Sequence, residues 1–400
     1  MGGGLMQLVA YGAQDIYLTG NPQITFFKVV YRRHTNFSME CIEQTINGSV
    51  GAGARTTTTV SRNGDLVSGM YIRIAKGAVI GEESGSNPGH NILDSVECEI
   101  GGQKIDKHYG HWMETHAQLT EENDGQVAAA ALDTGTGAVQ GMTVFQSTAL
   151  AGGILDCTGD TTLADAAFVP LRFWFCRNAG LALPLIALQY HEVKVIVNWS
   201  AAIASTSATI AANTSLWADY IYLDTDERRR FAQVSHEYLI EQVQHQDAAG
   251  GALNTELNFN HPVKELVWVG KAAQAWGAAH AGSGVFADVL GTNWQLKLNG
   301  HDRFAEQPVS YFTQLQVTKY HTGCGSRAMF VDQGVNGIAV YSFALKPEEH
   351  QPSGTCNFSR IDNAQLKSST AGATQGMNIY AVNYNVLRIM SGMGGLAYSN

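Results

Sequence analysis

Three histidines in the first third of the chain have a spacing that suits metal binding. His108 and His111 are three residues apart and His116 follows on the same short segment, so a helix there would bring the imidazoles toward one face. Imidazole is a common zinc ligand, but a structural zinc site takes four protein ligands with supporting hydrogen bonds. The sequence indicates neither a fourth ligand nor such support. We therefore predict packing or surface histidines, with no metal and no cofactor.

Two carboxylates could in principle act as a catalytic pair. Glu97 and Glu99 are two residues apart, which on a strand places both on one face at roughly 6–7 Å, near the range of glycosidase pairs. They alternate with Val96, Cys98 and Ile100, however, and this alternation is typical of any strand with one face in solvent. We interpret both as ordinary strand residues.

Other catalytic motifs are incomplete. The chain has no GxxxxGK[ST] phosphate loop and no GxSxG serine elbow. The glycines of Ser391–Gly395 precede no helix that could hold a dinucleotide. His191-Glu192 and His236-Glu237 begin a zinc-protease motif but lack its second histidine. The sequence predicts no catalytic residues and a protein that is not an enzyme.

Charge excludes packaging of nucleic acid by direct contact. The formal net charge is −10, and the only short basic runs are Arg32-Arg33 and Arg228-Arg229-Arg230. The second run lies in the sequence DTDERRR, which starts at Asp224. Either its carboxylates neutralise the three arginines locally, or Arg228, Arg229 and Arg230 contact a neighbouring subunit.

The elements that must position these residues are mostly strands. Apolar residues alternate at Met70, Ile72 and Ile74, the 43 glycines suit tight turns, and helical periodicity is scarce. A glycine hairpin at Gly101-Gly102 is echoed half the chain later at Asn299-Gly300. This weak duplication predicts two mostly-β halves side by side, as two sandwiches or jelly rolls. We assign 1–23 as an N-terminal arm, 24–223 and 237–400 as the two halves, and 224–236 as a linker.

The arm is the first candidate for assembly. Leu5, Leu8 and Val9 have helical spacing and Tyr11 follows them. Beyond the turn at Asn21-Pro22, the run Ile24–Tyr31 is strongly β-favouring, so we expect it to open the first half as a strand.

Two stretches lack lysine and arginine altogether. His108–Leu171 holds eight carboxylates, and Ala272–Gln295 is rich in glycine and alanine. Apart from helical patterning near Trp112–Leu119, we expect exposed excursions from a sheet scaffold. Such loops leave open a carbohydrate-binding or glycoside-cleaving jelly-roll protein as an alternative function.

The sequence contains few signals for covalent modification or for cellular location. No segment of about 18 apolar residues is present, and no basic-then-apolar leader is visible. The six cysteines form no CxxC, which favours free thiols in a reducing compartment. Of the five Asn-x-Ser/Thr matches, which we take as incidental without an export signal, Asn213 is kept as a candidate N-glycosylation site.

Long stretches of the chain resemble the major capsid proteins of large icosahedral DNA viruses of the chlorella-virus and phycodnavirus type. They run in order from one end to the other: Gly2–Glu40, Gln44–Val50, Ser61–Leu66, Glu99–Tyr109, Gly180–Lys194, His236–Gln242, Tyr341–Pro347, Gln351–Ala364 and Asn383–Tyr398. The departures are His116–Ala167 and Ala272–Asn293, which look like the family's surface towers.

The resemblance implies an all-β chain of two tandem eight-stranded antiparallel jelly rolls with long loops and a short N-terminal arm. It implies a structural protein that forms homotrimers, pseudo-hexameric capsomers that tile an icosahedral shell. The implied partners are neighbouring capsomers and minor capsid and penton proteins. The internal membrane would be a partner only indirectly, and nucleic acid not at all. The implied location is the virion, with synthesis and assembly in the host cytoplasm.

Overall fold

A computed structural model describes residues 3–10, 12–75, 88–122, 145, 166–201, 214–270, 290–323, 325, 337–369 and 376–398. The chain divides into two compact units, Met1–Asn36 and Phe37–Asn400. Within the described residues, no helix is long and apolar enough to cross a membrane.

The N-terminal unit consists of two short helices and an extended segment. Helices α1 (Gly3–Val9) and α2 (Asp15–Thr19) bury no residue. The strand expected over Ile24–Tyr31 is not formed: residues 26–28 turn, and the first strand, β1 (Phe37–Gln44), begins later. The prediction was wrong because β propensity needs a neighbouring strand to accept and donate hydrogen bonds, and none of the described strands pairs with this segment.

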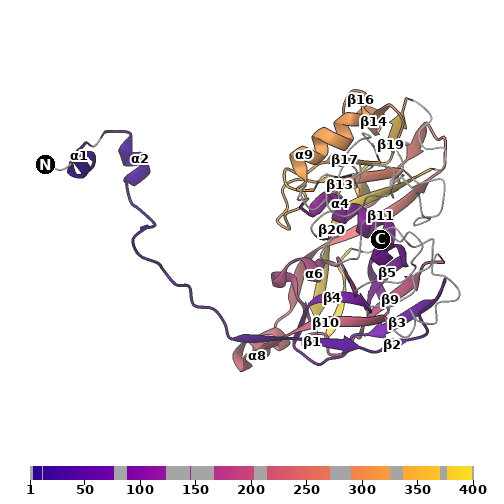
Figure 1. Cartoon of the computed structure of the whole chain (residues 1–400), viewed down its shortest axis with the longest axis horizontal. Helices are drawn as coiled ribbons and strands as arrows, with labels where there is room; N and C mark the ends of the chain where they lie inside the picture. The colour runs from indigo at the N-terminus through magenta and orange to yellow at the C-terminus, as the bar shows by residue number, and fades with distance from the viewer. Residues whose placement is uncertain are drawn as a thin grey trace, which may run out of the picture. The chain divides into compact units, whose positions relative to one another are not determined.

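The first sandwich packs two antiparallel sheets face to face. In one, β1, β10, β4 and β7 follow one another, as Figure 1 shows for the first three, and β8 pairs with β4. In the other, the order is β2, β3, β9, β5, β6. The bounds not yet given are β2 Ile46–Asn47, β3 Arg55–Thr59, β4 Leu66–Ile74, β5 Leu93–Ile100, β6 Gln103–Tyr109, β7 Ala167–Pro170, β8 Leu183–Pro184, β9 Val193–Trp199 and β10 Thr214–Leu223.

The second sandwich repeats this plan. One sheet has the order β11, β20, β13, β17, with β18 on β13 and β21 on β20, and the other has β12, β19, β14, β15, with β16 on β14. The bounds are β11 His236–Ala248, β12 Asn254–Glu256, β13 Pro262–Gly270, β14 Asn293–Leu298, β15 His301–Asp302, β16 Gln307–Pro308, β17 Ile338–Ser342, β18 Cys356–Asn357, β19 Ala364–Ser368, β20 Met377–Met390 and β21 Met393–Leu396. The duplicated β architecture expected from the sequence is confirmed.

The two predicted hairpins are present. Gly101 and Gly102 have φ of 58° and 86° and join β5 to β6, and Asn299 and Gly300 have φ of 51° and 79° and join β14 to β15. Two successive positive φ angles are what a two-residue hairpin of type I′ requires, so these turns could be predicted from the sequence.

Short helices connect the strands. They are α3 Pro88–Asn91, α4 Gly110–Thr120, α6 Trp174–Arg177, η3 Ala179–Leu181, α8 Thr225–Gln233, the π-helix η4 Tyr311–Leu315, α9 Gln316–Tyr320 and η6 Phe358–Arg360. Helix α8 occupies most of the segment assigned as a linker. Strand β7 ends at Pro170, and α6 follows after three intervening residues.

Helix α4 corrects the expected exposed excursion. Its side chains Trp112, Met113, Glu114 and Leu119 are each at most 2% exposed. Met113 belongs to the core of the first sandwich, whereas Trp112 and Leu119 pack with residues of β13, β17 and β20. The helical patterning near Trp112–Leu119 is confirmed by α4, but the expected exposure was wrong from His108 to Thr120. It was also wrong at the other end of the stretch, where Ala167, Val169 and Leu171 are buried. Of the rest of the expected excursion, 123–144 and 146–165 lie outside the described residues, as does most of the second one, Ala272–Gln295.

Candidate assembly surfaces and the junction between the sandwiches

The three candidate metal histidines have separate partners. His108 Nε2 lies 2.8 Å from Asp106 Oδ2, and its ring stacks on Phe173 at 4.8 Å between centroids. His111 Nδ1 contacts the Tyr380 hydroxyl at 3.0 Å, and His116 contacts Thr120 on its own helix. No group of three or more histidine, cysteine, aspartate or glutamate side chains able to hold a metal occurs among the residues that the structure describes.

The Glu97 and Glu99 side chains lie on the β5–β6 hairpin. Glu97 Oε1 is 2.9 Å from Lys107 Nζ, and Glu99 stands opposite Lys104 in the strand register. Both carboxylates therefore face cross-strand cations, which is an ordinary arrangement on an exposed hairpin.

The basic run on α8 does not form the expected local pairs. Asp224 caps the helix by accepting a hydrogen bond from the Thr225 backbone N–H. The partner of Arg228 is Asp65, whose Oδ1 accepts from Nε at 2.8 Å. Asp65 is buried and also accepts from the Leu223 backbone N–H. Local neutralisation was therefore the wrong interpretation for Arg228.

The other two arginines of the run are exposed. Arg230 lines a surface hollow of ≈ 480 Å³ together with Glu227, Phe231 and Glu237. This leaves Arg229 and Arg230 accessible to a partner in the single chain.

A buried charge cluster links the two sandwiches. Glu241 on β11 is 6% exposed, and its Oε2 lies 2.7 Å from Arg177 on α6 and 2.8 Å from Lys264 on β13. His350 Nδ1 is 3.8 Å from the other oxygen. Burial alone would raise the pKa of Glu241, but His350, Lys264 and Arg177 outweigh it and lower the pKa to about 2. The carboxylate is therefore ionised and doubly paired.

A second ionised group lies nearby on the second sandwich. His321 is nearly buried and contacts Glu265 at 3.3 Å and Glu348 at 3.1 Å. Burial would lower the pKa of His321, but the two carboxylates raise it to about 9. The imidazolium is thus favoured at neutral pH.

Polar and apolar contacts also cross the junction. The Gln242 side-chain amide donates to the Ile105 carbonyl, and the Val243 N–H donates to Asp106 Oδ1 at 3.1 Å. Leu387 and Ile389, at the end of β20, pack in the core of the first sandwich. Sequence reasoning missed this junction, although charged Lys264 and Glu265 inside an otherwise apolar strand were a signal of buried pairs.

The candidate arm residues are highly accessible. Leu5, Leu8 and Val9 are 57%, 79% and 72% exposed, while Tyr11 lies outside the described residues. Large apolar side chains exposed in this number are typical of a surface that binds another protein. The candidate glycosylation site Asn213 also lies outside the described residues.

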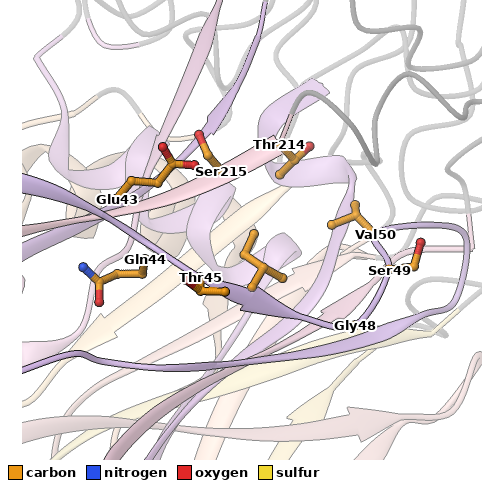
Figure 2. A pocket seen from close by; sticks show the side chains of 9 residues that line it. Glu43, Gln44, Thr45, Gly48, Ser49, Val50, Thr214 and Ser215 are labelled. Atoms are coloured by element: carbon orange, nitrogen blue, oxygen red, sulfur yellow. The ribbon is translucent and has the colours of Figure 1, made fainter.

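One hollow on the first sandwich has a mostly polar lining. It measures ≈ 680 Å³ and lies where β1 turns into β2, next to the start of β10 (Figure 2). Glu43 is the one carboxylate among its nine lining residues, so these residues provide no acid–base pair for glycoside cleavage.

Two antiparallel sandwiches in tandem, joined through a common junction, define a double jelly-roll protein of the viral coat class. Comparison with known proteins is specific. The family model described as "Major capsid protein N-terminus" matches residues 25–224, and that described as "Large eukaryotic DNA virus major capsid protein" matches residues 227–395. The chain belongs to the family of major capsid proteins of large eukaryotic DNA viruses.

Full-length relatives agree with this assignment. The chain is 51% identical to the major capsid protein of Pyramimonas orientalis virus and 42% identical to that of Paramecium bursaria Chlorella virus 1, and each alignment covers 100% of both chains. It superposes on the quasi-atomic model of the PBCV-1 virus capsid with a TM-score of 0.70 and 38% identity, covering 94% of this chain and 100% of the other. The Faustovirus major capsid protein shares the fold, with a TM-score of 0.64 at 13% identity, covering 95% and 94%. The chain is therefore a structural component of the capsid shell of a large DNA virus.

Proposed function

We propose that three copies of this chain form a homotrimeric, pseudo-hexameric capsomer, and that these capsomers tile the icosahedral shell. The observation that carries the proposal is the presence of two jelly-roll sandwiches in one chain. Three such chains supply six similar sandwiches, so a trimer can occupy a position of near-hexagonal outline in a shell.

The contacts between capsomers are assigned to the arm and to helix α8. We propose that Leu5, Leu8, Val9 and Tyr11 of the arm, together with the α8 run Arg228–Arg230, contact neighbouring capsomers or minor capsid and penton proteins. The exposure of the described arm residues supports this role. In this scheme the arm is 1–23, the jelly rolls are 24–223 and 237–400, and 224–236 connects them.

The remaining proposals concern where the shell assembles, what lies inside it and how its protein is modified. We propose assembly in the host cytoplasm, indirect contact with the internal membrane, no direct contact with nucleic acid, and glycosylation at Asn213. The net charge of −10 supports the lack of contact with phosphates.

The test is the mass of the purified protein in solution. Size-exclusion chromatography with light scattering should give three times the chain mass of 43.1 kDa. A stable monomer at micromolar concentration would contradict the proposal, and glycan cleavage by that monomer would support the carbohydrate-active alternative.

A further inference from the structure

Strand β1 forms an open edge of the first sandwich. It pairs along its whole length with β10, from Phe37 opposite Leu223 to Gln44 opposite Leu216. In the described part of the chain, no strand pairs with its other side. Alternate N–H and C=O groups of an antiparallel edge strand point away from the sheet, so the edge has hydrogen-bonding groups for one more strand.

Apolar side chains lie on the edge strand β1, and aromatic side chains lie farther across the same sheet, on β10, β4 and β7. The rings of Trp217 and Tyr71 stack at 6.5 Å with 4° between their planes, and Phe168 meets Tyr71 edge-on at 5.9 Å. On β1 itself, Phe37 is 53% exposed and Met39 is 60% exposed. A strand that adds to β1 would therefore find apolar side chains to pack against as well as backbone partners.

The segment Ile24–Tyr31 matches this edge in length and character. It has eight residues, as β1 does. Its apolar side chains are exposed, from 70% at Ile24 to 97% at Phe27, and the unit that contains it has no buried helix residue. Its sequence has strong β propensity, so a hydrogen-bonding partner is what it lacks in the single chain.

The charges of the segment and of β1 are also complementary. Lys28, Arg32 and Arg33 lie in or directly after the segment, and no acidic residue occurs between Asp15 and Glu40. Strand β1 carries Glu40 and Glu43, both exposed. A basic strand beside an acidic edge is favourable and helps to fix the register.

A hairpin with β1 of the same chain would need a turn in the connection. Residues 29–36 contain neither a turn nor a bend, which favours a partner strand in another chain. We propose that Ile24–Tyr31 of one chain adds as a strand to the open edge of β1 in a second copy within the same capsomer. This inference rests on the proposed trimer and names the contact that the segment makes in it.

The length of the connection between Ile24–Tyr31 and β1 limits how far apart the two copies can lie. Five residues, Arg32–Asn36, separate the segment from β1 of its own chain, and a fully extended connection of this length spans at most about 20 Å. The β1 strands of the two copies must therefore approach within about this distance.

The test uses the exposed native thiol of Cys41 on β1. Single replacements Phe26→Cys, Phe27→Cys, Lys28→Cys and Val29→Cys are introduced into the full chain, and disulfides are formed under mild oxidation. Because side chains of a strand alternate between faces, two alternate positions should cross-link two chains at least about fivefold more than the other two. The same replacements combined with Cys41→Ser should give no such band.

Two results would overturn the inference. One is a disulfide within a single chain, seen as a monomer of altered mobility on a non-reducing gel. The other is a yield of cross-linked chains that is equal, or negligible, at all four cysteine positions. Light scattering on the unmodified protein separates the two proposals: a trimer without the alternating cross-links refutes only the strand exchange, whereas a monomer refutes the capsomer.

Charge reversal provides a second, independent measurement. Lys28→Glu with Arg32→Glu and Arg33→Glu should reduce the yield of the best cross-link at least about fivefold, because like charges would then face each other. Adding Glu40→Lys and Glu43→Lys should restore it. If the cross-link yield of the combined variant stays as low as that of the first variant, the proposed pairing is wrong.

Discussion

Replacing Glu241 with glutamine should weaken the junction between the two sandwiches more than any surface change of similar size. The glutamine keeps the shape but removes the charge that pairs with Arg177 and Lys264. Lys264 is 2% exposed, with its Nζ 2.8 Å from the carboxylate and 5.6 Å from the Tyr384 ring centroid. Breaking a buried pair leaves the ammonium uncompensated, so the expected loss in the free energy of unfolding is about 3–5 kcal/mol.

The same interaction makes stability depend on acid pH. The pKa of Glu241 is lowered from 4.5 to about 2 in the folded chain. A lowered folded-state pKa stabilises the protein above the unfolded value, and this contribution disappears as the pH falls from about 4.5 toward 2. Its full size is about 3 kcal/mol, in line with the loss expected for the glutamine variant.

The assay is denaturant unfolding at pH 7 and pH 3.5, followed by tryptophan fluorescence. Glu237→Gln is the matched control, because Glu237 lies on the same strand and pairs with Arg388 at 2.8 Å but is 58% exposed. An exposed pair contributes less than about 1 kcal/mol. The pair of variants Glu241→Leu and Lys264→Met in one chain should recover much of the loss. The two most buried charges are then removed together, and Arg177, whose side chain is 23% exposed, can contact water. The reasoning is refuted if Glu241→Gln stays within about 1 kcal/mol of the parent or matches Glu237→Gln.

Three further predictions concern other sites. The pKa of His321 is raised to about 9, so its contribution of about 3 kcal/mol to the free energy of unfolding is complete below pH 6.5 and lost as the pH rises through 9. In His321→Gln, the free energy of unfolding should therefore change less between pH 6.5 and pH 9 than in the parent. Gly110→Ala should lower the melting temperature strongly, because a Cβ there would collide with the Leu93 and His90 carbonyl oxygens, whereas Gly51→Ala, in open space, should not. Deleting residues 2–20 should leave the circular dichroism of the sandwiches unchanged and abolish shell assembly in electron micrographs; normal particles would exclude an assembly role for the arm.

The sequence predicted those parts of the fold that depend on local conformation. The hairpins at Gly101-Gly102 and Asn299-Gly300 could be located because positive φ angles restrict the residues that a turn accepts. Their separation by half the chain then indicated the duplication. Alternation of Met70, Ile72 and Ile74 likewise identified β4, because one face of that strand is buried.

Features that depend on distant partners could not be predicted in this way. The acidic stretch after His108 suggested exposure, yet Glu114 is fully buried because His90 and Gln118 provide hydrogen bonds to its two oxygens. Asp65 and Arg228, 163 residues apart, pair beside the start of β4 and the end of β10, and nothing in the local pattern DTDERRR indicated this. The composition of a segment does not predict its burial, because burial depends on which distant residues pack against it.

The junction explains why the two sandwiches behave as one folded unit rather than two tethered domains. Strand β20 is 14 residues long, and its side chains enter successive cores: Ile379 packs in the second sandwich, Tyr380 and Val382 in the cluster with Trp112 of α4, and Leu387 in the first sandwich. A strand that is continuous through three clusters cannot tilt at one end without disturbing the packing at the other, since close-packed interiors do not deform gradually. The pairing of Glu241 with Arg177 then adds a charged contact across the same boundary. In a shell built from many copies, a fixed angle between sandwiches would make every proposed capsomer the same shape, which tiling requires.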